Sequence, residues 1–307
     1  MITDNLLKNR NFSWFDVEEP RSEDFDTLST KFNLPYLLVQ DTLRPEHLPK
    51  YESSDDGHFI MMRSFDSDSQ EDSTTVQELT RKIALFITPD RILSIHRVQL
   101  DYLRKISDKS AKGEEPKSLQ ALIHQIVLAI IRTYEDPIYK LQTVYDDFET
   151  DVLSKRCEQL DLTKIYIFRR QVFVIKRILK QTNDSLYRSR DLWEEYPSML
   201  QDLKENIDQL YFQLDEISDN FEHLFQLHFA LNDERANQVM KVLTVFSSVL
   251  LPLNFIASFY GMNFDYLPGL HSYSGLGWVI LSMALTSIVT ILIFRKNGWF
   301  KGPRQYE

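Results

Sequence analysis

The stretch of sequence that determines the fold is VLTVFSSVLLPLNFIASFY, residues 242–260, which contains no Asp, Glu, Lys or Arg. A second stretch of the same kind, GWVILSMALTSIVTILIF, follows at residues 277–294. A helix rises about 1.5 Å per residue, so it crosses a hydrocarbon core of ~30 Å in about 20 residues. The two stretches therefore predict transmembrane helices at 241–260 and 277–295. Core helices of a soluble protein are the alternative, but neither stretch has the charged face that such helices usually carry.

The charges that flank the two stretches predict their orientation. Lys and Arg occur before the first stretch and after the second, whereas the connecting segment 261–276 has neither. Positively charged residues favour the cytoplasmic side of a membrane. We therefore expect a multi-pass protein of the cell (inner) membrane with both termini in the cytoplasm. Segment 261–276 is then an extracytoplasmic loop, and residues 296–307 form a basic cytoplasmic tail.

The rest of the chain is acidic and polar. The formal net charge is −10 over 307 residues, although the C-terminal tail is basic. An acidic surface argues against binding to nucleic acid, whose phosphates require clustered Lys and Arg. It is typical of a soluble region that attracts cations.

Residues 1–115 predict a cytoplasmic α/β domain. A helix is expected over 22–32 and an acidic loop over 67–75. Short apolar runs of strand length lie at 12–17, 58–65, 82–87 and 91–96. The last two runs are expected to pair as a hairpin, because Thr88, Pro89 and Asp90 between them are turn residues.

Residues 116–240 predict a helical stalk region, with one helix over 118–160, a second over 162–193 and a third that begins at Pro197. Apolar residues of the third helix recur at spacings of three and four from Leu200 to Leu231, which is typical of helix–helix packing. No Pro or Gly lies between Ser198 and Leu251, so this helix is expected to continue into the first span. So long a helix needs the preceding helices, or further copies of itself, to cover its apolar seam. The predicted fold class is an α+β membrane protein.

The first span differs from the second in its polar residues. Several of its residues lie three or four positions apart and therefore share one helical face: Thr244, Ser247, Leu251, Asn254 and Ser258. Polar groups at membrane depth are costly unless they face water or a partner. The stripe predicts a water-lined face, although a single hydroxyl can instead bond its own backbone or a neighbouring helix.

The residues at the outer end of this span carry a resemblance. Tyr260-Gly261-Met262-Asn263 resembles the YGMN signature of CorA-type magnesium channels, the GMN-motif family of divalent-cation channels. The segments ANQVMKVLT at 236–244 and NFDYLP at 263–268 are similar to that family as well. The resemblance implies a funnel-shaped homopentamer whose first span lines a central pore. It implies a Mg²⁺ channel, with Co²⁺ and Ni²⁺ as surrogates, that is not an enzyme and has no organic cofactor.

The resemblance also implies a selectivity filter formed by Tyr260, Gly261, Met262 and Asn263. Mg²⁺ gives up its water reluctantly, so amide oxygens of an Asn263 ring would accept hydrogen bonds from the hydrated ion. Gly261 would let the chain leave the helix and turn. Without the resemblance, Asn263 would be interpreted as an ordinary residue at a helix C-terminus.

Further roles follow from the same resemblance. Leu243 and Leu251 would form apolar constrictions that gate by size and dewetting, although the family often has Met at the second position. Asp265 is the sole carboxylate of the outer loop. The complete expected pore lining is Asn237, Met240, Leu243, Thr244, Ser247, Leu251, Asn254 and Ser258.

Regulation by cytoplasmic Mg²⁺ is a further implication, with Asp202 on the stalk and Asp68 in the acidic loop as candidate ligands. The alternative is that both are solvated surface acids. The expected partners are further copies of the chain, membrane lipid and divalent cations.

Three other functions remain open at this point. The nearest is a ZntB-like Zn²⁺ transporter of the same superfamily, but the pore segment has none of the His or Cys ligands that favour Zn²⁺. A membrane-tethered enzyme or receptor is a second alternative, and no HExxH, CxxC or P-loop motif supports it. A regulatory relative that conducts no ions is the third.

Overall fold

The computed structural model describes residues 2–8, 12–20, 24–44, 46–54, 57–112, 116–154, 161–262 and 273–299. The chain divides into two compact units, Met1–Leu224 and Phe225–Glu307. We call them the first and the second unit. The long helix α8 (Pro197–Tyr260) contributes residues to both.

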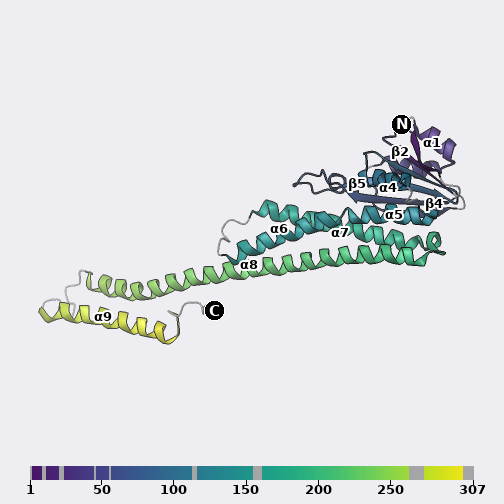
Figure 1. Ribbon diagram of the computed structural model, residues 1–307. Helices are drawn as coiled ribbons and strands as arrows, with labels where there is room; N and C mark the ends of the chain where they lie inside the picture. Colours follow the sequence, from purple (N-terminus) through teal and green to yellow (C-terminus); the bar gives the residue numbers. More distant parts are fainter. Residues whose placement is uncertain are drawn as a thin grey trace. The chain divides into compact units, whose positions relative to one another are not determined.

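A six-stranded sheet organises the N-terminal part of the first unit (Figure 1). Its strands are β1 (Ile2–Lys8), β2 (Ser13–Glu18), β3 (Lys50–Ser54), β4 (Gly57–Phe65), β5 (Thr80–Thr88) and β6 (Arg91–His96). Their spatial order is β1-β2-β6-β5-β4-β3, and every neighbouring pair is antiparallel except β2 and β6. The expected hairpin of β5 and β6 is confirmed, with Thr88 opposite Arg91.

Helices cover the sheet, which explains why its central strands are apolar almost throughout. On one face, α1 (Asp24–Phe32) and α2 (Tyr36–Leu43) contribute Leu28, Phe32 and Val39 to a core that includes Phe59 and Phe86. Helix α5 (Leu119–Arg132) lies against β4. Just after α5, the hydroxyl of Tyr134 donates to the carbonyl of Arg63 at 2.7 Å. Short helix α3 (Val76–Leu79) and α4 (Asp101–Ala111) complete this region.

Two predicted helices need correction. The helix expected over 118–160 is in fact α5 followed by α6 (Glu135–Leu153). The helix is interrupted at Thr133 and Tyr134. Pro137 lies in the first turn of α6, where the missing N–H of a proline is tolerated. The helix expected over 162–193 ends at Arg188 as α7 (Leu162–Arg188), and Arg190–Trp193 form a 3₁₀ turn instead.

The apolar seam of α8 is buried within the first unit, as its spacing predicted. Its buried residues are Leu200, Leu203, Ile207, Leu210, Leu214, Ile217, Phe221 and Leu224. Phe221 packs against Phe148 of α6 and Phe168 of α7, with ring centroids 6.1 and 4.8 Å apart. The preceding helices of the same chain therefore cover the seam as far as Leu224.

The second unit contains the rest of α8 and helix α9 (Tyr273–Lys296). Both helices are long and apolar enough to cross a membrane, with mean hydropathies of 1.9 and 2.3 over their most apolar windows. Those windows are 0% buried. The second unit thus presents its apolar side chains outward, the reverse of the first unit.

Candidate functional site

Helix α8 carries all the residues that the sequence assigns to the pore lining, and the described filter residues Gly261 and Met262 follow its last residue, Tyr260. It is continuous from Pro197 to Tyr260, with Pro252 inside it. A proline at this position removes the hydrogen bond to the carbonyl of Ser248. Neighbouring helices or water can satisfy such a freed carbonyl in a membrane. Continuity matters because a regular helix keeps residues three and four apart on one face.

The predicted pore-lining residues are exposed within the single chain. Met240, Leu243 and Leu251 are 56%, 63% and 67% exposed, and of the full set only Ser247 is half-buried. The other half-buried positions between residues 245 and 256 are Val245, Ser248, Val249, Pro252, Leu253 and Ile256. By helical periodicity this second set lies on nearly the opposite side of α8 from the pore-lining set. The chain therefore leaves the polar stripe uncovered.

The hydroxyl groups of the two apolar helices differ from the amide of Asn254 in their hydrogen bonds. In α9, Ser282, Thr286, Ser287 and Thr290 each donate to a backbone carbonyl three or four residues earlier, at 2.8 or 2.9 Å. In α8, Thr244 does the same toward Met240 at 2.8 Å. Asn254 has no hydrogen-bond partner among the residues that the structure describes. Self-satisfied hydroxyls suit a lipid-facing helix, whereas a free amide needs water or another chain.

After the C-terminal end of α8 at Tyr260, the structure describes the chain only as far as Met262. The backbone N–H of Gly261 donates to the carbonyl of Ala257 at 2.9 Å, so the helical hydrogen-bond pattern continues to this glycine. Tyr260 is 38% exposed and Met262 is 51% exposed. Asn263 and Asp265, the expected filter amide and outer carboxylate, lie outside the described residues, as does most of the basic tail.

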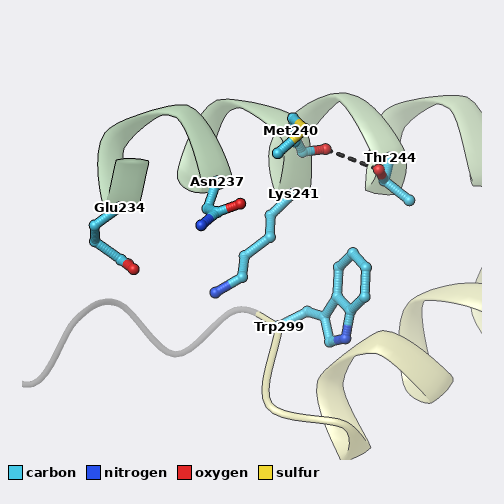
Figure 2. A pocket seen from close by; sticks show the side chains of 6 residues that line it. All are labelled: Glu234, Asn237, Met240, Lys241, Thr244 and Trp299. Atoms are coloured by element: carbon cyan, nitrogen blue, oxygen red, sulfur yellow. Dashed lines mark hydrogen bonds between the residues drawn. The ribbon is translucent and has the colours of Figure 1, made fainter. Parts of the chain in front are cut away.

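A cavity of about 220 Å³ lies at the other end of the apolar part of α8 (Figure 2). It is lined by Glu234, Asn237, Met240, Lys241, Thr244 and Trp299. The structure thus brings three predicted pore residues together with three residues that the sequence did not assign. Lys241 is the last charged residue before the apolar run, and Trp299 follows the other span. The positions of Lys241 and Trp299 beside the two apolar stretches are the sequence signals that could have indicated this cavity.

The two expected regulatory carboxylates lie in different surroundings. Asp202 of α8 accepts a hydrogen bond from Asn206, and its Oδ2 lies 2.7 Å from Nε2 of His124 on α5. Asp68 is exposed, and its backbone N–H donates to Asp66 at 3.3 Å. No group of three or more His, Cys, Asp or Glu placed to hold a metal ion occurs in the described part of one chain. His124, far from Asp202 in sequence, gave no signal of its partnership.

Comparisons with known proteins indicate the family of the chain. The family model described as "CorA-like Mg2+ transporter protein" matches residues 9–296. The cobalt/magnesium transport protein CorA of Methanocaldococcus jannaschii is 24% identical over 295 residues, which is 93% of this chain and 90% of that protein.

Solved structures show the same fold. The complete structure of the CorA magnesium transporter from Methanocaldococcus jannaschii matches with a TM-score of 0.73 at 20% identity, over 96% of this chain and 93% of that one. The ZntB cytoplasmic domain from Vibrio parahaemolyticus matches with a TM-score of 0.60 at 16% identity, over 74% of this chain and 90% of that one. At these identities the likeness concerns the fold alone.

Proposed function

Since this chain belongs to the CorA-like Mg²⁺ transporter protein family, we propose that it is a channel that moves hydrated Mg²⁺ into the cytoplasm, with Co²⁺ and Ni²⁺ as further cargo. It is a membrane protein with an N-terminal α/β domain, a long helix and two apolar C-terminal helices. The observation that carries the proposal is the stripe of α8, which is largely polar and exposed and lies on the side away from the half-buried face. In an apolar span such a stripe requires water or partner chains.

A homo-oligomer supplies both the partner chains and a water-filled channel. One helix cannot enclose a pore, but copies arranged about an axis turn their stripes toward a common channel. We propose a funnel-shaped homopentamer with both termini in the cytoplasm. Its pore is lined by Asn237, Met240, Leu243, Thr244, Ser247, Leu251, Asn254 and Ser258. Leu243 and Leu251 narrow the channel, and the polar residues between them contact the hydration shell of the ion.

Residues 260–263 form the outer filter in this proposal. Neutral amides suit hydrated Mg²⁺, because they accept hydrogen bonds from its water without removing it. The membrane potential drives entry at about 2.3 kcal/mol per charge per 100 mV, and a divalent ion gains roughly twice that. No cofactor is needed for this step, since the ion itself is the cargo.

Regulation by cytoplasmic Mg²⁺ is part of the proposal. Asp202 and Asp68 act as ligands of a regulatory ion that holds the pore closed. One chain does not assemble a complete ligand set in its described residues, so the remaining ligands come from a neighbouring copy or from water. Asp202→Lys places an ammonium where the ion would bind, and Mg²⁺-dependent closure is then expected to disappear.

Zn²⁺ transport is the second candidate, favoured by the likeness of the cytoplasmic part to the ZntB domain. The pore-lining stripe argues against it, because it offers oxygen groups and no imidazole or thiol.

The proposal is tested by ion uptake into proteoliposomes that carry the purified protein. Wild type is compared with Asn263→Ala and with the control Asn220→Ala, which changes the same residue type in the cytoplasmic part of α8. We expect Mg²⁺ uptake in wild type and in the control, and its collapse in Asn263→Ala. Zn²⁺ and Co²⁺ are measured in parallel. Uptake of Zn²⁺ without Mg²⁺ would establish the second candidate instead.

A further inference from the structure

The cavity at the inner end of the spans is lined partly by the proposed pore residues Asn237, Met240 and Thr244, and partly by Glu234, Lys241 and Trp299, which the proposed pore does not use. Glu234 and Lys241 share one side of α8, which is turned by roughly 110° from the centre of the pore-lining stripe. Figure 2 shows Glu234, Asn237 and Lys241 extending from α8 toward the side where Trp299 lies. The cavity volume of about 220 Å³ is several times the roughly 30 Å³ that one water molecule occupies in the liquid. It therefore has room for a polar group of several heavy atoms.

The two charges have opposite sign and a fixed order along α8. Glu234 precedes Lys241 by seven residues, so their backbones are separated by about 10 Å along the helix axis. No ion pair joins them, and Lys241 has no carboxylate partner anywhere in the described part of the chain. The carboxylate of Glu234 accepts a hydrogen bond from the amide of Gln238 at 3.3 Å. The cavity thus offers one anion-binding and one cation-binding group.

The depth of these residues identifies the kind of ligand. Lys241 is the last charged residue before the uncharged run 242–260, and Trp299 follows the basic end of α9, Arg295 and Lys296. Lys and Trp at such positions lie at the level of lipid headgroups. Glu234 then lies further into the cytoplasm. A phospholipid with an ethanolamine headgroup has the same order, with its phosphate near the hydrocarbon and its ammonium beyond.

We propose that this cavity binds the zwitterionic headgroup of a phosphatidylethanolamine-type lipid. The lipid phosphate accepts hydrogen bonds from the ammonium of Lys241, and the lipid ammonium donates to the carboxylate of Glu234. The proposal rests on the membrane placement of α8 and α9 given above, but not on Mg²⁺ transport. It predicts a preference by chemistry. Phosphatidylcholine has no N–H to donate, and phosphatidylglycerol has no cation for Glu234.

The wild-type protein provides the first test, because the lipid can be varied instead of the chain. The purified protein in detergent is loaded with phosphatidylethanolamine, its N-methyl and N,N-dimethyl forms, phosphatidylcholine or phosphatidylglycerol, and the retained lipid is counted by native mass spectrometry. We expect phosphatidylethanolamine to bind about tenfold more tightly than phosphatidylcholine, since a charge-assisted hydrogen bond is lost. The methylated forms should fall between the two. Equal retention across the series would overturn the proposal.

Two further measurements distinguish a phosphatidylethanolamine site from a site for any anionic lipid and from a site for a soluble phosphoamine. Phosphatidylglycerol that binds more tightly than phosphatidylethanolamine would reveal a plain anionic-lipid site. Free phosphoethanolamine is expected not to displace the lipid at equal concentration, because it lacks the acyl chains that hold the headgroup at the membrane. Displacement would assign the cavity to a soluble phosphoamine.

Variants then separate the two charges. Glu234→Gln should abolish the preference for phosphatidylethanolamine over phosphatidylcholine, whereas the exposed control Glu222→Gln should keep it. Lys241→Gln should weaken all phospholipids together, and the control Lys180→Gln on α7 should not. A preference that survives Glu234→Gln would contradict the ammonium contact.

The lipid preference and the transport activity can fail independently. Asn263→Ala is expected to lose uptake and keep the preference. If a variant at Glu234 or Lys241 does not fold, the methylated lipid series on wild type still decides the proposal.

Discussion

Helix α8 meets two different environments on either side of Leu224. Before this residue, Leu203 and Ile207 are fully buried against other helices of the chain. After it, Leu243 and Leu251 are 63% and 67% exposed. The first part has an apolar seam with charged residues on its other faces, and the last part is apolar nearly all round. A seam can be covered by one chain, whereas an all-round apolar helix needs lipid or further copies.

The two units therefore depend on different partners for their stability. The first unit has its own core and paired polar groups, such as the Trp14 indole that donates to Ser94 at 3.0 Å. In the second unit no described side chain is buried. We infer that substitutions of buried apolar residues in the first unit change folding, and that equivalent substitutions of exposed apolar residues in the second change what the chain binds or conducts.

The same substitution in both parts of α8 gives the largest expected contrast. Leu203→Ala opens a cavity in a packed core and should lower the free energy of unfolding by about 2–5 kcal/mol. Leu251→Ala removes an exposed side chain and should change it by less than about 1 kcal/mol. Thermal unfolding in detergent measures both.

Ion uptake should show the reverse pattern, with a change in Leu251→Ala and none in Leu203→Ala. Leu251→Ala is expected to raise Mg²⁺ uptake per folded channel, because it widens the proposed constriction. Leu203→Ala should leave uptake per folded channel unchanged. Equal destabilisation by the two substitutions would contradict the division of α8 at Leu224.

The next-largest expected effect on stability comes from a buried charged network in the sheet. His96 lies on β6 with its Nε2 3.1 Å from both carboxylate oxygens of Asp16 on β2, and its Nδ1 is 2.8 Å from the carbonyl of Val98. Carbonyl and carboxylate oxygens only accept, so these contacts favour the charged form of His96, in which both ring nitrogens donate. Burial alone would lower the pKa of His96, but the hydrogen bond and charge of Asp16 and the Val98 carbonyl raise it above its ordinary value.

The sign of the pH dependence follows from that direction. A histidine whose pKa is raised by folding contributes stability that is complete below about 6.5 and is lost as the pH rises through the folded value. His96→Gln should lower the free energy of unfolding by about 1–3 kcal/mol at pH 6 and by less at pH 9. The exposed control His223→Gln should show neither change. Unfolding curves of wild type and both variants at the two pH values measure these differences.

Lys82 on β5 should act in the opposite direction. Burial, with the nearby charges of Arg63 and Arg97, lowers the pKa of Lys82 to about 7. Its Nζ donates to the carbonyls of Asp41 and Arg44 at 2.9 and 2.5 Å. Between pH 7 and its ordinary value near 10.5, the unfolded chain binds a proton that the folded chain has released, so stability rises with pH.

Lys82→Met should remove this rise. We expect a loss of about 1–2 kcal/mol in the difference between pH 7 and pH 10, since partial solvent exposure screens the effect. The exposed control Lys105→Met should keep the wild-type slope. A slope that is unchanged in Lys82→Met would show that Lys82 stays charged across this range.

The sequence predicted those elements whose local pattern matches their final environment. The spacing of Leu200–Leu224 was sufficient to predict a buried seam, and the absence of Pro and Gly predicted that α8 continues into the span. Strands β1 and β3 were missed because ITDNLLK and KYESS lack a strand pattern and are held by pairing at the sheet edges. The break between α5 and α6 was missed because apolar residues continue on both sides of it.

The same rule explains what could be predicted of the candidate site. The stripe of α8 is local, so periodicity revealed it. The cavity joins Glu234 and Lys241 to Trp299, and the regulatory candidate Asp202 meets His124, 78 residues away. Such contacts between residues far apart in sequence depend on the path of the chain between them, which no local pattern encodes.

The pair of His124 and Asp202 gives the smallest expected effect. Asp202 has a half-exposed side chain, so a double-mutant cycle with His124→Ala and Asp202→Ala should return a coupling energy of about 0.2–1 kcal/mol. If Asp202 binds a regulatory ion as proposed, millimolar Mg²⁺ competes with His124 and the coupling falls toward zero. The ion pair of Lys176 and Asp215 is a matched control in the same unit. Its coupling should not change with Mg²⁺ at constant ionic strength. A His124–Asp202 coupling that is equally insensitive would remove Asp202 from the regulatory site and leave it as one more surface contact of the first unit.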